Sequence, residues 1–226
     1  GNLGALYDNL GRWEEAEPLY LRTLSIRESV LGPDHPNLVL ILSVLGNLYE
    51  KIDRSQEAEF LYLRVLSIQE SALGPNHPDM AVGLSQLGMF YSGQGRYEEA
   101  VSLQVRFLSN RESVLGPDHP DVAVNLNYLG MLYSEIGLYE EAESARLRAL
   151  AIQESVLGPD HPDLAVGLGQ LGGVYIALGR YEEAEPLFQR SIAILESTYG
   201  PDHPDLAIPL RQIVTVYTGQ DRWEEA

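Results

Sequence analysis

The sequence lacks cysteine and has few basic residues and no long apolar run. Without cysteine the chain has neither disulfides nor thiolate metal sites. Lys51 is the only lysine, and 33 acidic against 15 basic side chains give a formal net charge of −18. Nucleic acids are bound through clustered Lys and Arg, so we expect no nucleic-acid partner. The apolar stretches are shorter than the roughly 18 to 20 residues of a membrane span. We expect no membrane insertion and a cytoplasmic location.

Five histidines mark a regular repeat. His35, His77, His119, His161 and His203 follow one another at intervals of 42 residues, each inside a Gly-Pro-Asp/Asn-His-Pro string. A period of this length indicates one structural unit copied in tandem. We assign one array to 1–226 and expect it to be a fragment of a longer chain. Its full repeats are 35–76, 77–118, 119–160 and 161–202, and its partial repeats are 1–34 and 203–226.

Each repeat predicts a hairpin of two helices. Apolar residues recur at spacings of three, four and seven in both halves of the repeat, which is typical of amphipathic helices. The pattern breaks at Asp53, Gly95, Gly137 and Gly179. A glycine recurs in the first helix of five copies, where a residue without a side chain allows close approach of the second helix. The glycines are Gly4, Gly46, Gly88, Gly130 and Gly172. The repeat is therefore a tandem antiparallel helix hairpin.

The joints between hairpins carry matching stop and start signals. Gly158 and its equivalents follow a long helical pattern, where a left-handed glycine can end the helix. Pro162 and its equivalents fit the first turn of the next helix. Either the aspartate or the histidine that precedes this proline, Asp34 or His35 in the first joint, would cap that turn.

Several of these columns resemble a known repeat. Leu129, Gly130 and Tyr133 in the first helix, Gly137 in the turn and Ala142 in the second helix look like the tetratricopeptide repeat. The 42-residue length and the joint at 151–165 resemble the long variant of kinesin light chains and of many bacterial repeat proteins. The resemblance covers essentially the whole chain. It implies an all-α fold, a right-handed α-solenoid whose concave face holds peptides or partner helices.

The histidines and the paired acids have structural explanations. Helix layers are about 8–10 Å apart, whereas zinc needs its ligands at about 2.0–2.1 Å. One histidine per joint therefore does not complete a metal site, and we expect no metal and no cofactor. Acid pairs such as Glu140 and Glu141 lie in the first turn of a helix, where the dipole favours negative charge. The sequence shows no nucleophile and base beside them, so we expect no enzyme.

Function is expected where the copies differ on one face of their first helices. The variable positions are four residues apart within each helix, and a second variable line borders them. Amide side chains there can bind a peptide backbone, and Met89, Met131 and Tyr128 form a soft apolar patch. Tyr128 is equally compatible with a surface tyrosine that binds nothing. The predicted peptide-binding residues are Ser43, Asn47, Lys51, Ser85, Gln86, Met89, Asn127, Tyr128, Met131, Gln170, Arg211, Gln212 and Thr215.

The leading hypothesis is a non-enzymatic interaction scaffold that binds a peptide or helical segment of a protein in its concave groove. Kinesin light chains are expected to bind acidic peptides through basic grooves, whereas only Lys51 and Arg211 bring positive charge to this stripe. The expected ligand is therefore neutral or basic, with an apolar anchor. One alternative is self-assembly, because the truncated ends lack polar caps and could stack head to tail. Another is a regulatory or sensor array within a larger signalling protein.

Overall fold

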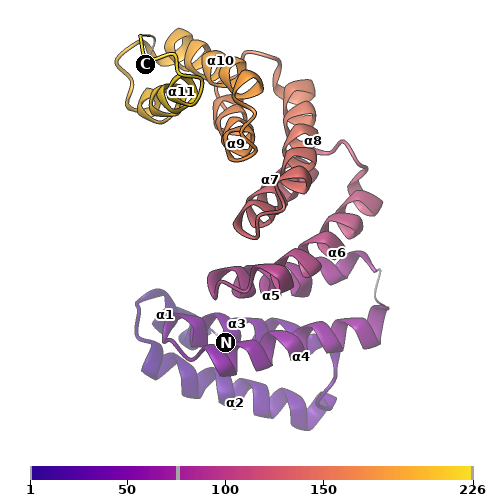
Figure 1. Cartoon of the computed structure of the whole chain (residues 1–226). Coiled ribbons are helices and arrows are strands. Elements are labelled where there is room, and N and C mark those ends of the chain that lie inside the picture. The colour runs from indigo at the N-terminus through magenta and orange to yellow at the C-terminus, as the bar shows by residue number, and fades with distance from the viewer. Residues whose placement is uncertain (1, 75–76, 225–226) are drawn as a thin grey trace. The chain divides into compact units, whose positions relative to one another are not determined.

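The computed structural model describes residues 2–74 and 77–224, and all regular structure in these ranges is helical (Figure 1). Consecutive helices pack in pairs, as expected for an α-solenoid of helix hairpins. Residues 1 and 225–226 of the partial repeats, and 75–76 of the first full repeat, lie outside the described ranges. The α-helices are α1 (Asn2–Asn9), α2 (Trp13–Leu31), α3 (Val39–Lys51), α4 (Ser55–Leu73), α5 (Ala81–Gly93), α6 (Tyr97–Leu115), α7 (Pro120–Glu135), α8 (Tyr139–Leu157), α9 (Leu164–Ala177), α10 (Tyr181–Tyr199) and α11 (Ala207–Gly219).

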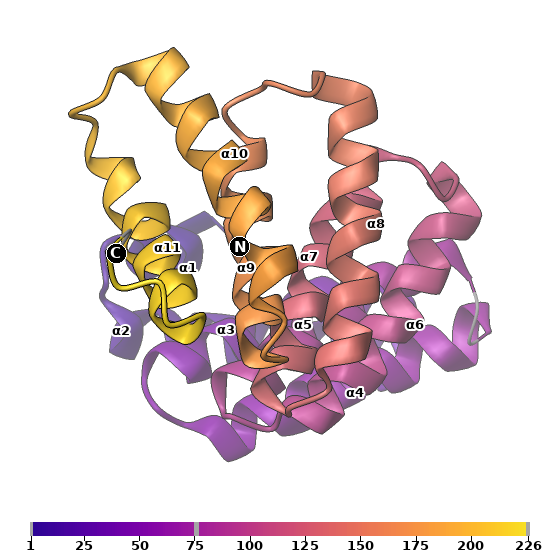
Figure 2. The same cartoon turned by 45° about the horizontal axis from the view of Figure 1, so that its top comes forward.

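The chain forms two compact units, residues 1–110 and 111–226, which we call unit 1 and unit 2. In unit 1, α2 contacts α1 and α3, and α4 contacts α3 and α5. In unit 2, α8 contacts α7 and α9, and α10 contacts α9 and α11 (Figure 2). Each of these four second helices thus contacts two first helices. The core of unit 2 accordingly combines Leu171 of α9, Phe188 of α10 and Val216 of α11, which no single hairpin could bury.

None of the described helices combines the length and the apolar character that crossing a membrane requires.

The joint glycines confirm a positive φ but not the left-handed helical conformation that the sequence suggested. Gly158 has φ 88° and ψ 161°, and Gly200 has φ 91° and ψ 164°. This region of positive φ with ψ near 160° is essentially restricted to glycine. The expected ψ was wrong because the chain leaves the helix in an extended direction towards the following proline. The backbone N–H of Gly158 still donates to the carbonyl of Glu154 at 2.9 Å, which closes the last turn.

Histidine, and not aspartate, caps the start of each joint turn. His35 and His77 have extended backbones, and proline follows each of them in the first position of the turn. Nδ1 of each imidazole accepts the N–H of the residue two positions later, at 3.1–3.3 Å in all five copies. This bond satisfies one of the free donors at a helix start. The 42-residue histidine column is therefore a row of helix caps.

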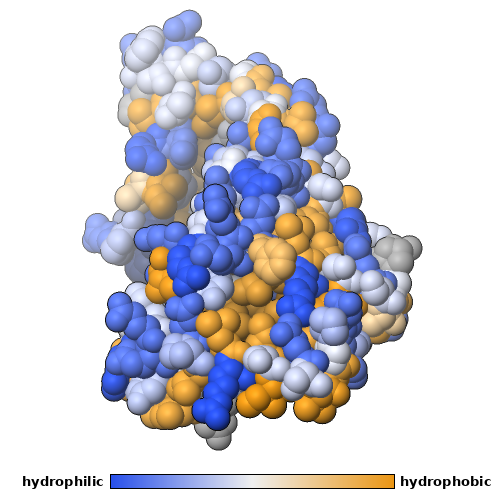
Figure 3. Space-filling view, turned by 90° about the horizontal axis from the view of Figure 1, so that it is seen from below, coloured by the Kyte–Doolittle hydropathy of each residue, from blue (hydrophilic) through white to orange (hydrophobic). Residues whose placement is uncertain are grey.

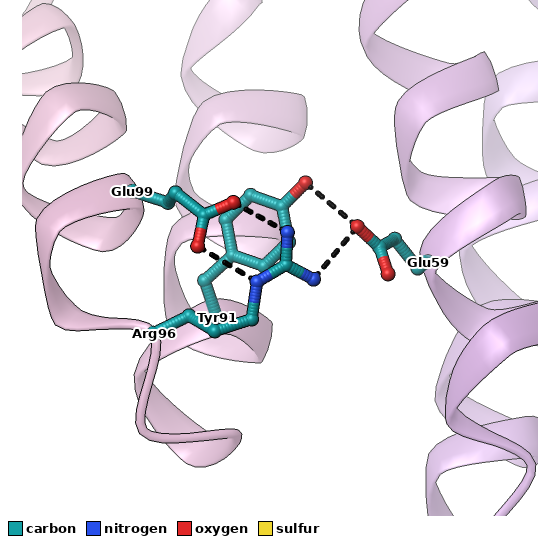
Figure 4. A network of polar contacts seen from close by, with 4 residues as sticks. All are labelled: Glu59, Tyr91, Arg96 and Glu99. Carbon is teal, nitrogen blue, oxygen red and sulfur yellow. Dashed lines mark hydrogen bonds and ion pairs between the residues drawn. The ribbon is translucent and has the colours of Figure 1, made fainter.

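A second recurring contact stabilises neighbouring hairpins through an arginine in the turn between two helices. In Figure 4, Nη1 of Arg96 donates to Oε1 of Glu59 at 2.8 Å, and Nε donates to Glu99 at 2.7 Å. The guanidinium stacks on Tyr91 at 4.1 Å, and the Tyr91 hydroxyl donates to Glu59 at 3.0 Å. Burial, together with Glu59, raises the pKa of Tyr91. The equivalent sets are Tyr49, Arg54 and Glu17 in unit 1, and Tyr175, Arg180 and Glu143 in unit 2.

Candidate functional site

Three predicted site residues of unit 1 contact other parts of the same unit. Ser43 is buried and its hydroxyl donates to Oε1 of Gln86 at 2.7 Å. Asn47 is exposed and accepts a bond from the hydroxyl of Tyr62 at 2.6 Å. Lys51 pairs with Asp8 at 2.7 Å, so its charge is already compensated within the protein. These three residues belong to the predicted stripe, but each already has a polar partner within unit 1.

The other predicted residues of unit 1 are more open. Met89 is exposed, and the hydroxyl of Ser85 lies 3.8 Å from its sulfur. Gln86 is half-buried between α3 and its own helix, where it accepts the bond from Ser43. Met89 therefore offers the main apolar contact on α5 among the predicted residues of this unit.

In unit 2 the predicted residues lie on three successive first helices. Asn127, Tyr128 and Met131 of α7 are half-buried, and Gln170 of α9 is exposed. Three more lie on α11, where Gln212 is half-buried and the other two are exposed: Arg211, Gln212 and Thr215. The three helices therefore present these side chains at the positions from which a ligand could contact them.

Sequence reasoning missed a column of exposed aliphatic side chains beside the predicted stripe. Each member lies near the start of a first helix, four residues before the second variable line, and is 52–69 % exposed. The signal was present as an apolar column that recurs every 42 residues but lies off the Leu-Gly-Tyr face of the helix. Other apolar residues such as Phe60 are also exposed, and Figure 3 shows apolar residues gathered between polar ones on one face. The members of the column are Leu40, Val82, Val124, Val166 and Ile208.

Unit 2 contains a pocket of about 630 Å³ between α9, α10 and α11. Its floor is formed by Phe188 and Leu195 of α10, which are buried, and one wall by Ile208 and Pro209 at the start of α11. Gln170 of the predicted stripe also lines it. The volume lies within the roughly 300–1,000 Å³ of ordinary ligand sites. We call this cavity the α9–α11 pocket.

The pocket is open because α9 carries glycines where other first helices carry side chains. Gly169 and Gly173 stand in the columns that hold Asn127 and Met131 on α7. A methyl group placed on either glycine would meet no described atom within 4 Å, so packing does not require them. A glycine inside a helix costs about 0.5–1 kcal/mol relative to alanine. The two glycines thus weaken α9 and leave the part of the pocket beside them unfilled.

Gly172, by contrast, is required by packing. A Cβ atom on Gly172 would lie 2.6 Å from the ring of Phe188, and one on Gly46 would lie 2.6 Å from the ring of Tyr62. This confirms that the glycine column of the five hairpins allows the close approach of their two helices.

Beneath α7 the same position is occupied by a charged side chain. Arg146 stands in the column that holds an aromatic residue in three other hairpins (Tyr20, Tyr62 and Phe188) and Gln104 in the fourth, and it is only 7 % exposed. Its Nη1 donates to Oε1 of Gln170 at 2.5 Å, and its Nε has no partner within the described residues. Burial lowers the pKa of Arg146. Most other cations form ion pairs, whereas Arg146 is buried against the side-chain amide of Gln170.

The rim of the α9–α11 pocket is acidic. Asp163 and Asp205 line it, their side chains are largely exposed, and the described lining contains no lysine or arginine. The imidazoles of His161 and His203 accept the backbone N–H groups of these two aspartates. No group of three or more His, Cys, Asp or Glu in the described ranges could hold a metal ion. The pocket can therefore contact a ligand through apolar side chains, amide hydrogen bonds and negative charge.

A family model described as tetratricopeptide repeat matches residues 1–71, 54–109, 79–154, 136–197 and 163–226. No curated protein matches the sequence. A crystal structure of nearly identical TPR-like repeats from a Podosopora anserina protein assigned as a kinesin light chain is similar, with a TM-score of 0.75 and 27 % identity over 88 % of this chain and 94 % of that one. BtubC (BKLC) from P. vanneervenii has a TM-score of 0.72 and 28 % identity, over 89 % and 80 %. MamA, at 20 % identity and a TM-score of 0.59 over 83 % and 85 %, shares the fold.

Proposed function

We propose, because the chain belongs to the tetratricopeptide repeat family, that its first helices bind a segment of another protein. Repeats of this family are generally protein-interaction scaffolds and generally not enzymes. The proposed ligand is a peptide or a helix that lies along the predicted stripe and places an apolar side chain on it. The proposal includes the cytoplasmic location, which imaging of a tagged chain tests.

The observation that supports this proposal best is the exposed aliphatic column of unit 2. Val124, Val166 and Ile208 recur at one helix position beside Tyr128 and Gln170. Single exposed apolar residues are normal, but a contiguous apolar patch bordered by polar groups marks an interaction surface. The column would supply apolar contacts, and the neighbouring amides would orient the ligand.

The charge of the protein favours a neutral or basic ligand. The net charge is −18, and Lys51 is compensated by Asp8. Among the predicted site residues, Arg211 is the remaining cation, and it is exposed on α11. An acidic ligand would be repelled by the overall field of such a protein, whereas a basic one would be attracted.

The test combines selection of peptides with a triple variant. Peptides that bind the unmodified chain are selected from a random display library, and their affinities are measured by fluorescence anisotropy. The triple variant Asn127→Ala, Tyr128→Ala, Met131→Ala should weaken binding at least tenfold and keep its helical circular dichroism. The control Ser144→Ala, Leu147→Ala changes exposed residues of α8 and should bind as the unmodified chain does. Unchanged affinity in the triple variant would contradict the proposal.

Self-association and a regulatory role are the alternatives. Light scattering over a concentration series separates self-association from peptide binding, because head-to-tail contacts can propagate and raise the average mass with concentration. A mass that stays at one value excludes self-assembly under those conditions.

A further inference from the structure

The groups that line the α9–α11 pocket indicate which kind of ligand it could bind. We infer that it binds one bulky apolar side chain of a protein segment that carries a lysine or arginine next to that side chain. This inference rests on the proposed function and names the ligand chemistry and the place where its anchor is bound. The sequence alone placed the anchor at Met89, Tyr128 and Met131 instead.

The apolar part of the inference comes from the floor and wall of the pocket. Phe188 is fully buried and Leu195 nearly so, although both line a cavity of about 630 Å³. Ile208 and Val166 are exposed at its edge and belong to the aliphatic column. An apolar side chain that enters would cover the exposed surface of Ile208 and Val166. Removal of apolar surface from water is the main favourable term in such binding.

The glycines of α9 supply the second step. Gly169 and Gly173 line the pocket, and no described atom lies where their side chains would be. Gly172, between them, is needed for contact with Phe188, but these two are not. Two helix-interior glycines with no packing role destabilise α9. Because neither glycine carries a side chain, the part of the pocket beside them stays unfilled.

The charge of the rim supplies the third step. Asp163 and Asp205 lie on two sides of the lining, at the starts of α9 and α11, and no described cation lines the pocket with them. A cationic side chain next to the apolar anchor would meet a carboxylate on either side. Gln170 directs Oε1 to Arg146, which leaves its amide NH2 to donate to a peptide carbonyl.

Binding is tested with blocked fluorescent peptides of the sequence Gly-Ser-Lys-X-Lys-Ser-Gly, where X is Leu, Phe or Trp. At least one member should bind, and its affinity should fall tenfold or more when X is Ala or when both lysines are Glu. Absence of binding by every member, or equal binding by the Ala and Glu versions, would overturn the inference.

The decisive variant fills the pocket with a residue that the same column already uses. Gly173→Met copies Met89 and Met131, and it should reduce peptide affinity at least tenfold without lowering Tm. Gly93→Met is the matched control, because Gly93 is also a helical glycine with no described atom near its missing side chain, but it lies on α5. Wild-type affinity in Gly173→Met would overturn the inference.

The rim is tested by changing charge alone. Asp163→Asn, Asp205→Asn copies Asn37, which stands in the same column. This double variant should lose about tenfold in affinity for the lysine peptides and show a weaker dependence on salt. The control Asp160→Asn, Asp202→Asn changes two exposed acids that are not part of the lining, and it should bind normally. Equal behaviour of the two double variants would argue against a specific role of the rim.

The two proposals can fail separately. If the library-selected peptides lose affinity in the α7 triple variant but bind Gly173→Met as they bind the unmodified chain, the proposed function stands and the pocket inference fails. If neither variant affects them, both proposals fail.

Discussion

The hairpin α7–α8 and the hairpin α9–α10 have the same backbone plan but opposite arrangements of side chains. In α7–α8 the first helix carries Asn127 and Met131 on either side of Gly130, against which the buried Arg146 packs. In α9–α10 the same first-helix positions are Gly169 and Gly173, which line a pocket together with the fully buried Phe188. The first arrangement has a polar floor with side chains above it, and the second has an apolar floor with a cavity above it.

This difference teaches that a site can arise on a repeat scaffold by removal of side chains. The recurring glycine, Gly130 or Gly172, lies against the floor residue in both hairpins, so the distance between the helices does not create the pocket. What changes is whether the neighbouring positions of the first helix project side chains over the floor. The same backbone thus provides either a filled surface or an open one.

The largest effect on stability is expected when the aromatic side chain of Phe188 is removed from the α9–α10 hairpin. Phe188→Ala should lower the free energy of unfolding by about 3–5 kcal/mol, the usual cost when a buried aromatic ring is replaced by a methyl group. Phe188 has no exposed surface and is part of the core that joins α9, α10 and α11. Urea unfolding followed by circular dichroism measures this loss. A loss below about 1 kcal/mol would show that the neighbours collapse into the space.

The next largest effect is expected when Arg146 of α7–α8 is replaced by the residue that α9–α10 has at the same position. Arg146→Phe should raise the free energy of unfolding by about 1–3 kcal/mol, because a buried group with an unpartnered Nε is replaced by the aromatic residue that Phe188 exemplifies. Chemical unfolding of the variant and the unmodified chain gives the difference. Arg148→Phe is the control, because Arg148 pairs with Glu112 and is more exposed, and it should give no such gain. A destabilised Arg146→Phe would mean that the bond to Gln170 matters more than desolvation.

The smallest effects are expected from alanine substitutions of two glycines of α9, which should change stability in opposite directions. Gly172→Ala should cost about 1–3 kcal/mol, because its Cβ would lie 2.6 Å from the ring of Phe188. Gly169→Ala should instead gain up to about 1 kcal/mol, because alanine favours the helix and its Cβ has open space. Thermal unfolding should therefore shift Tm in opposite directions for the two variants. Shifts of the same sign would contradict the assignment of one glycine to packing and the other to the pocket.

Much of the fold could be predicted because it depends on residues close together in sequence. Gly137 and Pro162 carry local conformational preferences that recur every 42 residues, so the helices and their joints could be located from the pattern. The choice between aspartate and histidine as the cap remained open, because both side chains can accept a backbone N–H at that turn. Only the coordinates of His35 and its equivalents decide it.

The candidate site was less predictable because its properties depend on distant residues. The charge of Lys51, which the sequence predicts to be free, is compensated by Asp8. Ser43 is buried against Gln86, and each of these two contacts joins residues 43 positions apart. The exposed aliphatic column could not be predicted, because an aliphatic residue that recurs in successive first helices is typical of a buried core position. Val166 is nevertheless largely exposed. The binding residues themselves stay predictions that the peptide experiments test.

The sequence by itself determined the period, the helix hairpins, the turns and the columns that pack between helices, because these follow from local backbone preferences repeated many times. Only the tertiary structure decided which polar side chains are buried, which cations are compensated and where a pocket remains. Those outcomes depend on contacts between residues of different repeats, such as Arg146 with Gln170, and on the α9–α11 pocket, which Gly169 of one repeat and Ile208 of the next both line. A single repeat read alone contains no such information, because a cavity is defined by the neighbours that do not fill it.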